Sequence, residues 1–139
     1  MKQHQELLEI RTRGRGFVEV TDRIHAAVGA SGVSVGLCVV YCSHTSCSLV
    51  IQENADPSAR HDMERWLERI APERDPTYTH TAEGPDDMPS HLRSMVTKTS
   101  ETIPVRDGRP AMGTWQGLYL CEHRARPHSR RLLVHVIGQ

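Results

Sequence analysis

The sequence has few aromatic residues, no long apolar run and no excess of charge of either sign. Aromatic residues make up 4% of the 139 residues, and Lys plus Arg equal Asp plus Glu at 17 each. Nucleic-acid-binding and membrane-surface proteins usually carry a basic field, so we expect neither kind of partner. The longest apolar stretch, Gly36 to Cys42, is far shorter than the ~20 residues of a membrane-spanning helix.

Processing signals and closely spaced cysteine pairs are also missing. The first six residues, MKQHQE, are too polar for a secretory signal peptide, so we expect a cytoplasmic protein. The four cysteines contain no Cys-x-x-Cys pair. A chain of this length can bury a core without disulfide bonds, and we therefore predict reduced thiols.

Alternating apolar residues predict several strands. We expect a hairpin over residues 8–20 and, beyond it, strands at 33–41, 48–52, 115–122 and 132–137. Asp107-Gly108 is a typical turn for a further hairpin, between 103–105 and 111–112.

Helical patterns lie between these strands. The best-marked helix has Asp56 as N-cap and Pro57 as first residue, and it ends before Pro72. Five of its residues are expected on one buried face: Ala59, Met63, Trp66, Leu67 and Ile70. Shorter helices are expected near 21–28 and at 90–98, the latter with Leu92, Met95 and Val96 facing inward. The order predicts a single α+β domain over residues 1–139, with a mainly antiparallel sheet or sandwich and two to three helices.

The nine histidines stand out in the composition. His80 lies in an irregular segment, 72–90, and His91 opens the helix that follows it. Segments of this length inside a compact domain are usually functional or disordered. Neutral imidazoles suit a catalytic zinc or similar ion, although solvated loop histidines are the simpler alternative. Three acidic residues between them could be oxygen ligands or could orient the imidazoles: Glu83, Asp86 and Asp87.

Three further segments carry candidate residues. His44 and Thr45 follow a predicted strand, where they could belong to a functional site or to an ordinary turn. Glu53 and Asn54 precede the Asp56 cap, with no structural role evident for either. In the segment 113–117, GTWQG, a strand bulge or a ligand approach is possible, and Trp115 could stack on a heteroaromatic ring or belong to the core.

Residues 123–131, HRARPHSRR, form the only basic run. Its guanidinium groups could bind phosphate, or the run could be a solvated hairpin tip. Two classes of protein remain open on these residues: a small metal-assisted enzyme and a ligand-binding domain without chemistry. Histidines and acids together in a Gly- and Pro-rich loop favour the enzyme.

Six of these motifs occur in one order, and together they resemble the YjbQ-like family, often labelled secondary thiamine-phosphate synthase. The resemblance covers about residues 8–138 and rests on HTS at 44–46, ENADP at 53–57, YTH at 78–80, EGPDDMPSH at 83–91, IPV at 103–105 and GTWQG at 113–117. The sequence differs from the family pattern at two places. Ser46 stands where many members have Thr, and Asp86-Asp87 stands where other members have an Asn.

The resemblance implies a compact α+β fold, a homotrimer and a divalent metal ion, zinc or magnesium. By position it assigns the metal to His44, His80 and His91. The implied reaction joins a hydroxymethylpyrimidine diphosphate to a thiazole phosphate and releases pyrophosphate. A metal-dependent hydrolase and a non-catalytic binding protein remain as alternatives.

The remaining candidates fall into two groups. As catalytic groups we predict Glu53, Asp56, Glu83 and Gln116. As groups that bind a small, possibly phosphorylated substrate we predict Thr45, Asn54, Trp115, Arg124 and Arg126.

Overall fold

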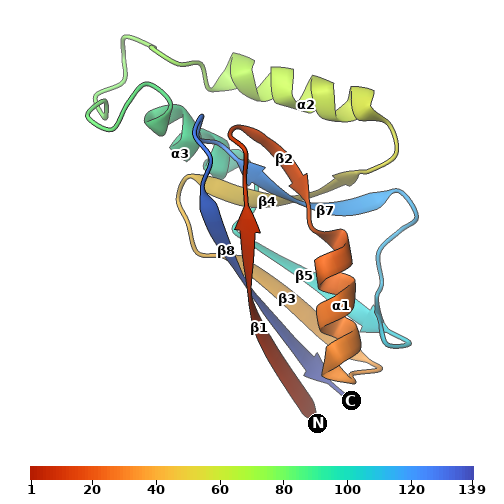
Figure 1. Ribbon diagram of the computed structural model, residues 1–139. Coiled ribbons are helices and arrows are strands. Elements are labelled where there is room, and N and C mark those ends of the chain that lie inside the picture. Colours follow the sequence, from red (N-terminus) through yellow and green to blue (C-terminus); the bar gives the residue numbers. More distant parts are fainter.

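Two antiparallel sheets share one core, with three helices around them (Figure 1). The computed structural model describes all 139 residues. The larger sheet has the order β1 (Lys2–Arg11), β8 (Ser129–Gly138), β3 (Gly36–Cys42), β5 (Ser100–Arg106) and β6 (Arg109–Pro110). The smaller sheet has the order β2 (Gly16–Glu19), β7 (Gln116–Glu122) and β4 (Cys47–Glu53). The helices are α1 (Thr21–Ser31), α2 (Pro57–Ile70) and α3 (Asp87–Val96).

The core is a cluster of 19 buried residues drawn from both sheets and from α1. Alternation decides which residues enter it: Leu132, Val134 and Val136 of β8 are buried, whereas Leu133 between them faces outward. The α+β class, the antiparallel pairing and the single domain predicted from the sequence are confirmed.

The predicted hairpin over residues 8–20 is wrong. β1 pairs with β8 of the larger sheet, and β2 pairs with β7 of the smaller one. Gly14 and Gly16 have φ angles of 118° and 150°, in the region that favours glycine. These glycines let the chain cross from one sheet to the other instead of turning back on itself.

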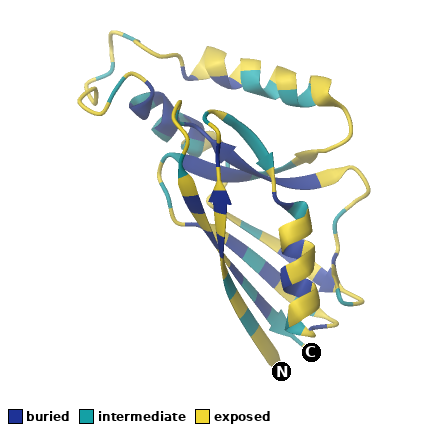
Figure 2. Cartoon of the chain, in the orientation of Figure 1, coloured by how far each residue is buried: buried dark blue, intermediate teal, exposed yellow.

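α2 begins as predicted, but most of its predicted apolar face is not buried. The Asp56 carboxylate accepts a hydrogen bond from the Ser58 N–H at 2.9 Å, and Pro57 is the first helical residue. Of the five residues expected to face inward, only Leu67 is buried, and Trp66 is 48% exposed. Figure 2 shows α2 mostly exposed above the smaller sheet.

α3 differs from its prediction in both its start and its buried face. It begins at Asp87 rather than at Ser90, so that Pro89 lies within its first turn. Met95 and Val96, expected inward, are exposed. The buried face is instead mainly polar, with Asp87, Ser90 and Arg93 beside Pro89.

The basic run is only partly solvated, because two of its members lie in a buried polar network. The Arg130 Nε donates to Glu122 Oε1 at 2.8 Å, and both side chains are buried. Burial raises the pKa of Glu122, but hydrogen bonds from Arg130 and Thr12 lower it by a larger amount, so that the net shift is downward. His123 is also buried, with its Nε2 2.8 Å from the Ser48 hydroxyl, and burial lowers its pKa to about 3.

Two further predictions agree with the structure. Asp107 and Gly108 have φ angles of 53° and 75° and form the two-residue turn between β5 and β6. The four cysteines are buried and form no disulfide. None of the three helices combines the length and the apolar character needed to cross a membrane.

Candidate metal centre

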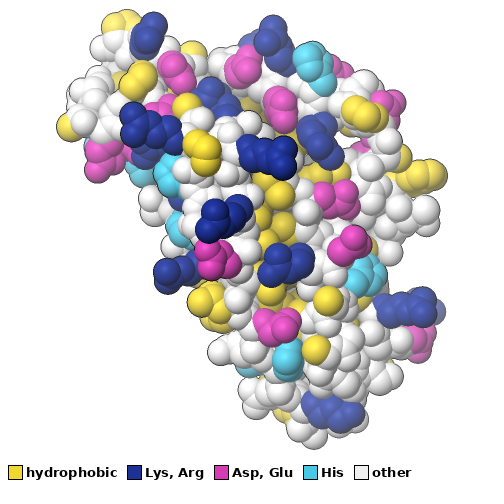
Figure 3. Space-filling model, viewed as in Figure 1, with side chains coloured by type: hydrophobic (Ala, Val, Ile, Leu, Met, Phe, Trp, Pro, Cys, Tyr) yellow, Lys and Arg dark blue, Asp and Glu magenta, His cyan; other side chains and the backbone are white.

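The loop between α2 and α3 and the first two turns of α3 bring His80, Asp87 and His91 together. Asp87 and His91 are four residues apart on α3, a spacing that places both side chains on one face of the helix. His80 reaches the same carboxylate from the loop, with its Nε2 2.8 Å from Asp87 Oδ2. The ligand atoms of the three residues lie within 4.8 Å of one another, a separation compatible with one shared metal ion. Figure 3 shows histidine, acidic and basic side chains adjoining one another on this side of the molecule.

Two hydrogen-bond partners fix the chemistry of His91. Its Nδ1 lies 3.2 Å from the Thr45 carbonyl oxygen, which can only accept, so Nδ1 carries a hydrogen. In the neutral ring, Nε2 then presents a lone pair, and it lies 3.2 Å from Asp87 Oδ2. Two acceptors at this distance need a cation between them, either a proton on His91 or a metal ion.

Asp87 is held as a carboxylate. Its side chain is 3% exposed, and its Oδ1 accepts from Arg124 Nη1 at 2.8 Å. Burial raises the pKa of Asp87, but hydrogen bonds and the charges of His91 and Arg124 lower it by more. The group is therefore ionised at neutral pH, as a metal ligand must be.

Arg124 orients the acidic residues. Its Nε donates to Asp86 Oδ2 at 2.9 Å, and its Nη2 donates to the Glu83 carbonyl at 3.1 Å. Asp86 also accepts from the Ala125 N–H at 2.8 Å, which ties the basic run to the start of α3. With these contacts and the bond to Asp87, the Arg124 guanidinium has little capacity left for a substrate phosphate.

A cavity of about 450 Å³ adjoins this group of side chains. The residues that line it include Glu83, Asp86, Arg124, Arg126 and His128. Arg126 is exposed and forms no ion pair, so its guanidinium is free to meet an anion. Glu83 Oε2 lies 3.7 Å from His80 Nε2, on the side of the cluster that adjoins this cavity.

His44 is not a member of the cluster in this conformation. Its Nε2 accepts a hydrogen bond from the Arg131 N–H at 2.9 Å, and burial, with the charge of Arg130, lowers its pKa. Thr45 contributes its carbonyl oxygen to His91 and Ser94. Of the three predicted metal ligands, the structure therefore brings together His80 and His91 and adds Asp87 to them.

The other five predicted residues lie at the far end of the smaller sheet. Glu53 ends β4 and Gln116 begins β7. Cys47 and Glu122 lie at the opposite ends of these strands, on the side of the histidine cluster. Six residues of strand span about 20 Å, which separates the two groups within one chain. The far group comprises Glu53, Asn54, Asp56, Trp115 and Gln116.

Local contacts account for part of this far group. The Asn54 N–H donates to the Trp115 carbonyl at 3.1 Å, and the Gln116 side chain accepts from the Gly113 N–H at 2.8 Å. Asp56 is the helix cap described above. The Trp115 ring is 66% exposed and therefore remains available for stacking.

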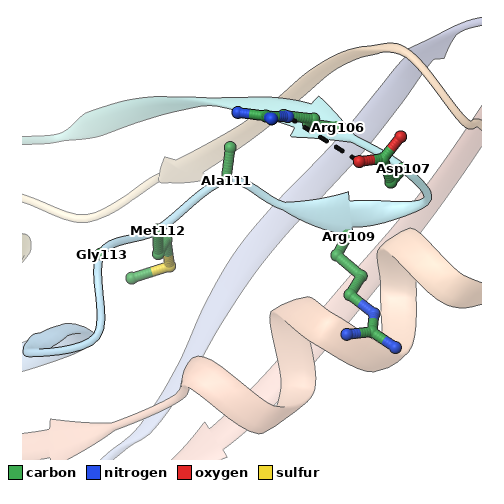
Figure 4. Close-up of a pocket in the computed structure, with 6 residues that line it drawn as sticks. All are labelled: Arg106, Asp107, Arg109, Ala111, Met112 and Gly113. Carbon is green, nitrogen blue, oxygen red and sulfur yellow. Dashed lines mark ion pairs between the residues drawn. The ribbon is translucent and has the colours of Figure 1, made fainter.

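Another cavity lies away from the histidine cluster. It measures about 560 Å³, sits at the β5–β6 hairpin and carries none of the predicted site residues (Figure 4). Its charged residues include the exposed pair Arg106 and Asp107, 3.8 Å apart. It is a shallow surface hollow without convergent polar groups.

The sequence pointed to Asp87 as a possible oxygen ligand or orienting group, but the predicted set of metal ligands contained only His44, His80 and His91. A signal was present, because Asp87 and His91 are four positions apart. It could be used only with α3 starting at Asp87, three residues earlier than predicted. Nothing in the sequence indicated that His123 and Arg130 are buried, because both lie within a run of basic residues.

Comparison with known proteins places this chain in a family. A family model described as UPF0047 protein YjbQ-like matches residues 6–139. The UPF0047 protein sll1880 of Synechocystis is 51% identical over 138 residues, covering 99% of this chain and 94% of that protein. The UPF0047 protein YjbQ of Escherichia coli O157:H7 is 43% identical over 137 residues, covering 98% of this chain and 99% of that protein.

Solved structures agree on the fold. A crystal structure of a YjbQ/UPF0047-family protein from Clostridium acetobutylicum, 32% identical, superposes with a TM-score of 0.87 and covers 95% of this chain and 99% of that one. A protein of unknown function from Sulfolobus solfataricus, 21% identical, gives the same score with 99% of each chain covered. The second match shows the fold alone.

Proposed function

Since the chain belongs to the YjbQ-like UPF0047 family, we propose, from its histidine cluster, that it is a metal-dependent enzyme acting on a small phosphate-bearing substrate. The observation that carries the proposal is the facing pair His91 Nε2 and Asp87 Oδ2, 3.2 Å apart, with the second imidazole of His80 on the same oxygen. Two imidazoles and one carboxylate, with the remaining positions open, are a typical set for a catalytic transition metal.

Zinc fits these donors better than magnesium. Magnesium prefers oxygen ligands, whereas two of the three donors here are imidazole nitrogens. Thr45 and Arg124 would orient His91 and Asp87 from behind, as such partners do in metal sites. A bound ion would supply positive charge to the leaving phosphate.

Each of the residues around the cluster has a separate role in the proposed reaction. Arg126, at the 450 Å³ cavity, would bind the phosphate of the substrate. Glu83, beside His80, would take the proton of the attacking water as the bond to the phosphate or diphosphate leaving group breaks. Arg124 would hold Asp86 and Asp87 in place without contacting the substrate. In this form the reaction is a hydrolysis.

Thiamine-phosphate synthesis is the second candidate, favoured by the exposed Trp115, whose ring could hold a pyrimidine. The same diphosphate would leave, but a thiazole nitrogen would attack in place of water. Trp115 lies about 20 Å from the histidines within one chain. This version therefore needs a second copy of the chain, and we propose the homotrimer as the assembly that would bring the two groups together. Light scattering after gel filtration would measure that state.

Turnover tests the roles of Glu83 and Arg126. We expect Glu83→Gln to lower kcat by about 100-fold or more while the metal is retained, because the variant lacks only the base. Arg126→Ala should mainly raise KM, and Asp62→Asn, an exposed carboxylate of α2, should change neither. Release of phosphate from p-nitrophenyl phosphate, and of phosphate or pyrophosphate from hydroxymethylpyrimidine diphosphate with and without thiazole phosphate, provides the measurement.

The outcomes separate the candidates. Release from the diphosphate only when thiazole phosphate is present would favour the synthase, and release without it would favour the hydrolase. Equal activity of Glu83→Gln and the parent protein would remove Glu83 from the reaction. No turnover of any of these compounds by a protein that carries metal would contradict the proposed substrate class.

A further inference from the structure

A second polar cavity lies between α2 and α3. It measures about 220 Å³. Its lining includes Arg15, which precedes β2, Phe17 within β2, Glu64 and Leu67 of α2, and Arg93 of α3. Arg93 follows His91 by two residues, which turns it about 200° around the helix. The cavity therefore faces a different side of α3 from the histidine cluster.

Arg93 is a buried charge without a direct ion-pair partner. The residue is 2% exposed, and no carboxylate lies within 4.0 Å of its guanidinium. Its Nε has no hydrogen-bond partner, and Nη2 has only a long bond of 3.5 Å to the Ala71 carbonyl. Buried charges in proteins are almost always paired, because removing an ion from water is costly. A guanidinium in this state indicates an anionic partner.

The other charges around the cavity are matched, with one exception. Arg15 pairs with Glu73 at 2.9 Å, and the buried Glu122 is bonded to Arg130. Glu68, also in the lining, lies 3.4 Å from Arg65.

The exception is Glu64, which forms no ion pair. Its Oε1 lies 3.8 Å from the position that a Cβ on Gly16 would occupy, so its carboxylate reaches across the cavity toward β2. Arg93 and Glu64 line the same space but are not within ion-pair distance of each other. The cavity therefore presents one unmatched positive charge and one unmatched negative charge, with the apolar groups of Phe17 and Leu67 near them.

We propose that this cavity binds a small α-amino acid, whose carboxylate contacts Arg93 and whose ammonium group contacts Glu64. The planar guanidinium fork matches a carboxylate. Phe17 and Leu67 favour a small aliphatic side chain. A simple anion would leave Glu64 unmatched, and a phosphate dianion would be repelled by it. This binding is independent of the proposed reaction, because none of its contacts involves the histidine cluster.

Calorimetric titration of the full chain tests the chemistry of the ligand. The probes are L-alanine, L-valine, propionate and L-alaninamide, since propionate lacks the ammonium group and the amide lacks the carboxylate. We expect the two amino acids to bind about tenfold or more tightly than either analogue, because each analogue leaves one charge of the cavity unmatched. Equal binding of alaninamide and alanine, or no heat with either amino acid at millimolar concentration, would overturn the proposal.

Variants test the two contacts separately. Arg93→Met and Glu64→Gln should each weaken L-alanine binding by about tenfold or more. The exposed Arg69→Met and Asp62→Asn on α2 should leave it unchanged, as should His91→Ala. Unliganded Arg93→Met should melt at the temperature of the parent protein or above it, because it removes an unpaired buried charge.

A merely structural arginine would give a different result. Arg93→Met would then melt clearly lower, and L-alanine would bind Glu64→Gln as well as it binds the parent protein. Retained affinity in both Arg93→Met and Glu64→Gln would place any bound amino acid elsewhere. Since Glu64 is only half-buried, its variant is expected to fold and to give an answer even if Arg93→Met does not.

Discussion

At the scale of single residues, the partner of a histidine decides what the histidine can do. His91 has its Nδ1 hydrogen fixed by a carbonyl and directs Nε2 at a carboxylate. The His44 Nε2 instead accepts a hydrogen bond from the Arg131 N–H. His123 is buried against a serine hydroxyl with its pKa lowered to about 3. The sequence shows the same side chain at each position, and only the fold assigns the partners.

The burial of His123 predicts a specific loss of stability in acid. Its pKa is about 3 in the folded chain and 6.5 as the ordinary value. Below pH 6.5 the unfolded chain therefore binds a proton that the folded chain does not, and stability falls as the pH falls until about pH 3. The slope contributed by this one group is at most about 1.4 kcal/mol per pH unit.

Urea unfolding at pH 7, 6, 5 and 4 measures this slope. His123→Gln, which can keep a polar atom near the Ser48 hydroxyl, should lose less stability than the parent protein between pH 6 and 4. Parallel stability curves for the two proteins would mean that His123 does not remain neutral in the fold.

At the scale of the elements, close contact between β3 and β8 depends on two glycines. Gly36 and Gly138 face each other in the register of these strands. A Cβ on Gly36 would lie 2.1 Å from the Ile137 carbonyl oxygen, a backbone atom that cannot move away without breaking the sheet. Gly29 in α1 is the opposite case, because nothing lies within 4 Å of its added Cβ.

These two glycines form a matched pair of substitutions. Gly36→Ala should destabilise the chain by about 2 kcal/mol or more, through overlap with the neighbouring strand. Gly29→Ala should instead stabilise it by about 0.5–1 kcal/mol, because alanine is the better helix former. Thermal unfolding of both variants should therefore move in opposite directions. A Gly36→Ala protein as stable as the parent would show that these strands are not packed so closely.

Local signals predicted the elements better than they predicted their partners. Asp56 and Pro57 begin α2, and Asp107-Gly108 forms its turn, because these features depend on backbone chemistry within a few residues. Apolar alternation predicted extended segments within residues 8–20, but it carries no information on which strand lies beside each of them. The inward face of α3 was predicted from apolar periodicity, and the fold buries Arg93 and Asp87 there instead.

At the scale of the whole molecule, the predicted site residues fall into two groups at opposite ends of the smaller sheet. The group of His80 and His91, with Asp87, has ligand atoms within 4.8 Å of one another, and the group of Trp115 and Gln116 has an exposed aromatic surface. The ordered motifs identified the family from the sequence alone, and the family model confirmed it. Distances between motifs could not be predicted, because they depend on which strands pair.

The metal content of the purified protein tests the central proposal most directly. We expect elemental analysis to find about one zinc ion per chain in the parent protein and in His25→Ala, an exposed histidine of α1. The double variant His80→Ala, His91→Ala should contain none, because it keeps only the carboxylate of the site. No metal in the parent protein after growth with zinc, or the same content in the double variant, would contradict the metal centre.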